Sequence, residues 1–101
     1  MANELLGALS GAESIEQCDR TASRVIDGKA VIITIDRNEL HVLNDVGTFV
    51  WQLADGRSLS AIADEVVQEF DVDREQATLD VCAFAQQLCS VGAVTLSKRK
   101  D

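Results

Sequence analysis

The chain has 101 residues, a length that accommodates one domain. Hydrophobic residues make up 47% and charged residues 26% of it, which excludes an intrinsically disordered protein, and no apolar run has the roughly 18 residues of a membrane span. Nine basic and seventeen acidic residues give a net charge of -8. Because nucleic acid and anionic lipid are bound mainly through Lys and Arg, this charge argues against both as partners.

The N-terminus and the cysteines indicate a cytoplasmic protein. The first ten residues contain Glu4 and no basic residue, so they lack the basic start of a secretory signal. The three cysteines, Cys18, Cys82 and Cys89, cannot all pair within one chain. Reduced thiols in the cytoplasm are the simplest interpretation.

The two ends of the chain differ from its centre in composition. Residues 1–19 are rich in Ala, Gly, Ser and Glu, and we expect an N-terminal tail that is mobile or loosely docked. Lys98, Arg99 and Lys100 make residues 97–101 a basic C-terminal tail. The domain itself is therefore expected over residues 20–96.

Residues 20–43 predict a three-stranded antiparallel meander. The β-branched run at 31–35 suits a half-buried strand. Asp27-Gly28 precedes it, and Asp-Gly supplies the positive φ angles of a two-residue hairpin. A second turn at 36–38 leads to a third strand, Leu40 to Leu43, which lies on one edge of the sheet.

Three helices follow the meander. Asn44 is the expected N-cap of the first helix, which Gly56 ends, and Ser58 caps a second, fully amphipathic helix that runs to Phe70. Asp73 and Gln76 resemble a capping box that opens the third helix. That helix ends before Gly92, and residues 93–96 add a short strand. The order predicts an α+β fold, a three-stranded antiparallel sheet followed by three helices, similar in outline to a winged helix-turn-helix.

The third helix has more apolar surface than one core stripe requires. Its core stripe consists of Ala77, Val81, Phe84, Leu88 and Val91, and Asp80 is the only charged residue between Gln76 and Val91. Either the weakly polar flank beside the stripe packs on the tail or the sheet, or it contacts a partner. This flank contains Thr78, Leu79, Cys82, Ala85, Gln86 and Cys89.

The third strand, next to this helix, is a candidate site for a peptide. A strand on the edge of a sheet has unpaired N–H and C=O groups, and an added strand can pair with them. The helix flank would then contact alternate side chains of the incoming peptide. An open edge would also allow a homodimer to form by edge pairing.

Two other classes of function are alternatives to a peptide-binding module. A winged-helix DNA-binding regulator is the alternative, but residues 58–91 contain seven acidic residues and only one basic residue, Arg74. A zinc site at Cys82, Cys89 and His41 lacks any C-x-x-C pair. His41 has no nucleophile at a recognisable spacing, so we expect no enzyme, no metal and no cofactor.

A spaced series of residues resembles the PqqD family over residues 20–96. It begins with Leu43-Asn44, before a helix that contains Trp51, and continues through Asp55-Gly56. Its other members are Gly47, Leu53, Ile62, Phe70, Asp80, Val81, Phe84, Leu88 and Gly92.

This resemblance implies a non-catalytic peptide chaperone of the kind that recognises ribosomally made precursor peptides. In such proteins the leader of the precursor adds as a strand to the third β-strand, beside the third helix. The partner enzyme is a radical SAM protein in the pyrroloquinoline quinone pathway, or a leader protease in lasso-peptide pathways. The implied peptide-binding residues are Glu39, Leu40, His41, Val42 and Leu43 on the strand, and Leu79, Cys82, Gln86 and Cys89 on the helix.

Overall fold

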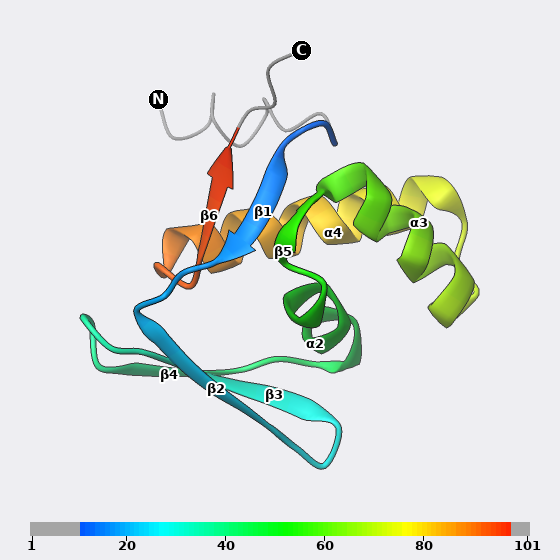
Figure 1. Ribbon diagram of the computed structural model, residues 1–101. Helices are drawn as coiled ribbons and strands as arrows, with labels where there is room; N and C mark the ends of the chain where they lie inside the picture. The colour runs from blue at the N-terminus through cyan, green and yellow to red at the C-terminus, as the bar shows by residue number, and fades with distance from the viewer. Residues whose placement is uncertain (1–10, 98–101) are drawn as a thin grey trace.

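The structure, a computed structural model that describes residues 11–97, contains two small antiparallel sheets and three helices (Figure 1). One sheet has the strand order β2-β3-β4 and the other the order β5-β1-β6. In chain order the elements are β1 (Ser14–Gln17), β2 (Thr21–Ile26), β3 (Lys29–Thr34), β4 (Glu39–Val42), α2 (Asp45–Gln52), β5 (Asp55–Ser58), α3 (Leu59–Phe70), α4 (Arg74–Ser90) and β6 (Val94–Ser97).

The β2-β3-β4 sheet is the predicted meander. Asp27 and Gly28 have φ angles of 53° and 81°, as the two-residue hairpin between β2 and β3 requires. Val31 on β3 lies opposite Arg24 on β2 and opposite Val42 on β4. This register turns Ala30, Ile32 and Thr34 toward the core. The opposite face of the sheet lies away from the helices (Figure 1).

The second sheet is a correction to the predicted order of a single sheet followed by helices. Within the expected N-terminal tail, Ser14–Gln17 form β1, and the Ile15 side chain is fully buried. β1 pairs with β5, which lies between the first two helices, and with β6 at the far end of the chain. The tail prediction is therefore wrong for these four residues, while residues 1–10 and 98–101 of the two predicted tails lie outside the described residues.

The helix caps confirm the predicted starts of the three helices. The Asn44 side chain accepts a hydrogen bond from the Gly47 N–H at 2.8 Å, and Ser58 Oγ accepts one from the Ala61 N–H at 3.1 Å. Asp73 Oδ1 accepts one from Gln76 at 2.7 Å. The first helix ends earlier than predicted, because α2 stops at Gln52 and Gly56 belongs to β5.

Trp51 on α2 connects the two sheets. Its side chain is buried, and its Nε1–H donates to Ser23 Oγ on β2 at 3.3 Å. Its carbonyl oxygen accepts a hydrogen bond from Gln17 Nε2 on β1 at 2.8 Å. The core around it is aliphatic, with Ile15, Ile32, Val50, Leu59, Ile62, Val66, Val81 and Leu88 as its largest fully buried side chains. Among residues 11–97, no helix is long and apolar enough to cross a membrane.

Candidate functional site

The outer edge of β4 is open. Within residues 11–97, β4 pairs with β3 alone. The Leu43 N–H just after β4 donates to the Ala30 carbonyl at 2.9 Å, so this N–H points toward β3. Because N–H groups alternate along a strand, those of Leu40 and Val42 point the other way, toward the open edge. These are the donors that an added strand would use.

The five predicted strand residues divide between the two faces of the sheet. Leu40 and Val42 are each 61% exposed and lie on the face away from the helices. Glu39 and His41 lie opposite the buried residues Thr34 and Ile32, on the face toward the helices. Leu43 is buried in the core.

Two contacts tie the ends of β4 to helix α4. Before β4, the Arg37 guanidinium donates through Nη1 to the Ser90 carbonyl at the end of α4, at 3.0 Å. After β4, Gly47 at the start of α2 lies so close to α4 that an added Cβ would be 2.6 Å from Phe84 Cε1. The segment from Arg37 to Gly47, which contains β4, therefore runs past α4 from Ser90 toward Phe84, in the direction opposite to the helix.

The face of α4 that contains Phe84 packs against Gly47 of α2, the helix that follows β4. At roughly 100° per residue, Asp80, Gln87 and Val91 lie within about 60° of Phe84 around the helix. Phe84, predicted to be a core residue, is half-buried, and Ala85, predicted to be in the flank, is fully buried. The β4 edge and the Phe84 face together define the candidate site, which we call the β4–α4 site: Leu40, His41, Val42, Asp80, Phe84, Gln87 and Val91.

The structure does not bring the predicted helix residues to this site. The four predicted residues lie about 140° to 160° around α4 from Phe84; they are Leu79, Cys82, Gln86 and Cys89. Cys82 instead lies near Glu13, at the start of β1. Burial raises the pKa of the Cys82 thiol, and the Glu13 carboxylate raises this pKa further. Leu79 and Cys89 are exposed, and Cys82 and Gln86 are half-buried.

His41 has an unsatisfied nitrogen at the β4–α4 site. Its Nε2 atom is buried and has no hydrogen-bond partner, although Glu39 Oε1 is 3.4 Å away. The imidazole therefore has hydrogen-bonding capacity that no described residue uses. In the part of the chain that the structure describes, no three His, Cys, Asp or Glu residues are grouped as metal ligands would be.

Three solved structures share this fold. The structure of TbiB1 in complex with the TbiA(beta) leader peptide is 25% identical, covers 85% of this chain and 99% of that chain, and has a TM-score of 0.73. A lasso peptide synthetase B1 complexed with its leader peptide is 24% identical, covers 81% and 98%, and has a TM-score of 0.72.

The third is the solution structure of the PqqD truncation of Methylobacterium extorquens PqqCD, described as a stand-alone recognition element for ribosomally synthesised and post-translationally modified peptides. It is 22% identical, covers 89% of this chain and 97% of that chain, and has a TM-score of 0.73. No curated protein shows significant sequence similarity to the chain. The sequence profile described as "Coenzyme PQQ synthesis protein D (PqqD)" matches residues 29–94, from the start of β3 to the start of β6. The chain therefore belongs to the PqqD family.

Proposed function

We propose that the chain is a non-catalytic peptide chaperone that binds the leader of a ribosomally made precursor peptide by strand addition at β4. The observation that carries this proposal is the open edge of β4 beside the Phe84 face of α4. The leader-bound state of TbiB1, which has the same fold, supports it. The chaperone presents the bound peptide to a processing enzyme in the cytoplasm, either a radical SAM enzyme or a leader protease.

The β4–α4 site can supply both affinity and specificity. The N–H groups of Leu40 and Val42 give main-chain hydrogen bonds that are independent of the peptide sequence. Alternate peptide side chains then point to opposite faces of the extended sheet. The peptide side chains on the face away from the helices lie beside Leu40 and Val42. The peptide side chains on the face toward the helices meet His41 and Phe84. We place the helical wall at Asp80, Phe84, Gln87 and Val91, in place of the predicted Leu79, Cys82, Gln86 and Cys89.

The charge of the chain favours this function over DNA binding. Of the residues on the Phe84 face, Asp80 is the only charged one, and its carboxylate repels phosphate. Binding at a main-chain edge beside an apolar wall also depends little on salt, whereas binding to DNA weakens steeply with salt. A salt titration therefore separates the two functions.

Replacement of Val42 by proline tests the strand addition. Val42→Pro deletes one N–H on the open edge while it leaves the β3–β4 hydrogen bonds in place. We expect the affinity for a synthetic leader peptide, chosen from a panel of precursor leaders as one that the wild-type protein binds, to fall at least tenfold, measured by fluorescence anisotropy. In the labelled wild-type protein, the leader should shift the amide resonances of β4 and of the Phe84 face.

Val25→Pro is the matched control. Val25 lies on β2, the opposite edge of the same sheet. The Ile35 N–H donates to the Arg20 carbonyl at 3.0 Å, so Arg20 and Ile35 form a hydrogen-bonded pair at one end of the β2–β3 pairing. Hydrogen-bonded pairs recur at every second residue, so the N–H of Val25, five residues after Arg20, points outward. Leader affinity should change less than twofold in this variant. An equal loss of affinity in both variants, or no loss in Val42→Pro, would refute strand addition at β4.

A further inference from the structure

The face of the β2-β3-β4 sheet that lies away from the helices is apolar and exposed. Two rows of side chains cross the three strands there: Arg24, Val31 and Val42 in one row, and Ala22, Ile33 and Leu40 in the next. Leu40 and Val42 are each 61% exposed and Ile33 is 40% exposed. Contiguous apolar surface of this kind marks a site of interaction in a small protein. We call it the outer sheet face.

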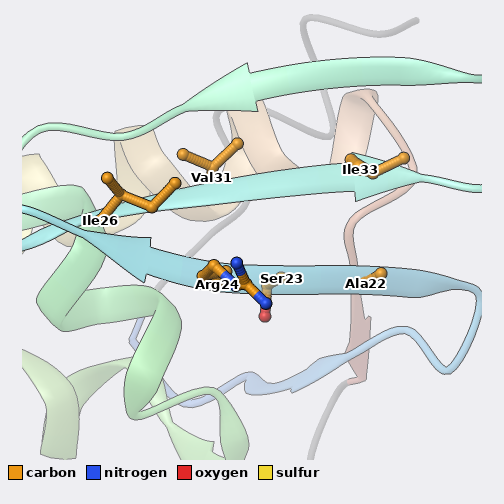
Figure 2. A pocket seen from close by; sticks show the side chains of 6 residues that line it. All are labelled: Ala22, Ser23, Arg24, Ile26, Val31 and Ile33. Atoms are coloured by element: carbon orange, nitrogen blue, oxygen red, sulfur yellow. The ribbon is translucent and has the colours of Figure 1, made fainter.

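The outer sheet face contains an open hollow between β2 and β3. Its volume is about 380 Å³, and it is shown from close by in Figure 2. The side chain of Arg24 lies at this hollow among aliphatic neighbours (Figure 2). The lining residues are Ala22, Ser23, Arg24, Ile26, Val31 and Ile33.

Arg24 differs from every other basic residue in the part of the chain that the structure describes. Residues 11–97 contain six basic residues, and Arg24 alone among them has neither an ion pair nor a side-chain hydrogen bond to another described residue. The other five are Arg20 with Asp36, Lys29 with Asp45, Arg37 with the Ser90 carbonyl, Arg57 with Asp55, and Arg74 with Asp64. The chain has seventeen acidic residues, yet none of those described forms an ion pair with Arg24.

We propose that the outer sheet face docks a second protein, one that presents a carboxylate ringed by aliphatic side chains, and that this carboxylate pairs with Arg24. Covering the aliphatic rows removes water from the guanidinium, so an apolar partner without an anion would leave a buried, unpaired charge. A carboxylate meets the guanidinium with two parallel hydrogen bonds.

The same charge pattern argues against two copies of this chain packed through their outer sheet faces. The two rows of the outer sheet face contain no acidic side chain, so two such faces packed together would oppose two unpaired arginines. We therefore take a different protein as the occupant, and the test below includes a second copy as the outcome that contradicts this choice. The outer sheet face extends beyond the peptide site: the two surfaces share Leu40 and Val42 on β4, whereas Arg24, Val31 and Ile33 lie on β2 and β3, away from the open edge.

A photo-crosslink identifies the occupant. In cells that encode the chain, p-benzoylphenylalanine is placed at Ile33 on the outer sheet face, and at Gln68 on the exposed side of α3 as the control. We expect a covalent adduct to one other protein from Ile33 and not from Gln68. No adduct above the control, or an adduct only to a second copy of the chain, overturns the proposal.

Charge reversal then tests the pairing with that purified protein. Arg24→Glu should weaken its binding at least tenfold in calorimetry, and replacing one acidic residue of the partner by lysine should restore the binding of Arg24→Glu. Arg57→Glu, the same charge change on β5, is the matched control and should change the affinity less than twofold. Unchanged binding of Arg24→Glu overturns the proposal.

A leader titration separates this proposal from the proposed function. Arg24→Glu should bind the synthetic leader as the wild type does, because Arg24 lies on the opposite edge strand from β4. An equal loss of leader affinity in Arg24→Glu would assign Arg24 to the peptide and overturn docking of a second protein. Failure of the wild type to bind the leader would refute the proposed function alone.

Discussion

Gly47 sets how closely α2 approaches α4, and thereby the position of the end of β4. A Cβ at this position would lie 2.6 Å from Phe84 Cε1, closer than any real Cβ contact. Gly47→Ala should therefore destabilise the protein by about 1–3 kcal/mol, the usual cost of overpacking, although alanine is the better helix former. Urea denaturation measures this change. In the Phe84→Leu background the same substitution should be nearly neutral or stabilising, and a stabilising Gly47→Ala in the wild-type background would contradict this contact.

The exposed ion pair of Arg20 and Asp36 connects the start of β2 to the turn before β4. Arg20 Nη2 is 2.7 Å from Asp36 Oδ1, and this hydrogen bond and charge lower the pKa of Asp36. Because the carboxyl pKa is lower in the folded state than its value of about 3.9 in the unfolded chain, the pair stabilises the fold above that pH. The stabilisation is lost as the pH falls through the lowered pKa.

Asp36→Asn should therefore lower the urea midpoint slightly at pH 7, and its difference from the wild type should disappear at low pH. Asp27→Asn is the control, because it removes the same charge from a hairpin residue in the left-handed conformation that asparagine also adopts. Since the pair is exposed, the effect of Asp36→Asn is small. A difference from the wild type that grows as the pH falls would contradict the role of the ion pair.

At the scale of elements, the peptide site depends on which face of α4 meets β4. Gln86 and Gln87 are neighbours with the same side chain, but Gln87 lies about 60° and Gln86 about 160° around the helix from Phe84. Gln87→Arg should weaken leader binding about tenfold, or about 1.4 kcal/mol, by placing a bulky charge in the β4–α4 site. Gln86→Arg should change the affinity less than twofold. Fluorescence anisotropy with the synthetic leader decides between the faces, and the reverse order of effects would restore the predicted flank to the site.

The elements that sequence predicts well are those specified by neighbouring residues. Asp27-Gly28 defines its hairpin locally, and Ser58 and Asp73 begin their helices through hydrogen bonds to residues three positions later. β1 and β5 carry no such signal. Each has four residues, and Ser14 pairs with Ser97 at the other end of the chain. Only the assembled fold shows that Ile15 belongs in the core.

The same limit applies to the candidate site. The edge strand β4 follows from the order of the hairpins, so its residues were predictable. The orientation of α4 was not, because its periodicity shows two weakly charged sides and does not show which one packs toward α2 and the segment that contains β4. Gly47 and Phe84 make that choice through a contact between α2 and α4. The glycine inside helix α2 is the one signal in the sequence that points to such a close approach.

At the scale of the whole molecule, Trp51 makes the two sheets one cooperative unit. Its indole donates to Ser23 in the β2-β3-β4 sheet, and its carbonyl accepts from Gln17 in the β5-β1-β6 sheet. Trp51→Ala should cost about 3–5 kcal/mol, the usual loss for a large buried side chain, from a total stability of about 5–15 kcal/mol for a protein of this kind. Chemical denaturation followed by far-ultraviolet circular dichroism measures the loss.

Trp51→Phe, with Ser23→Ala as its partner, separates the hydrogen bond of the indole from its packing. Ser23→Ala should cost about 1 kcal/mol in the wild type and close to nothing in the Trp51→Phe background, because the indole donor is then already absent. Trp51→Phe and the double variant Trp51→Phe, Ser23→Ala should each still unfold in one transition, since the aromatic ring continues to fill the space between the sheets. Two separate transitions in Trp51→Phe would show that the indole hydrogen bond, and not the buried ring, couples the β2-β3-β4 sheet to the rest of the fold.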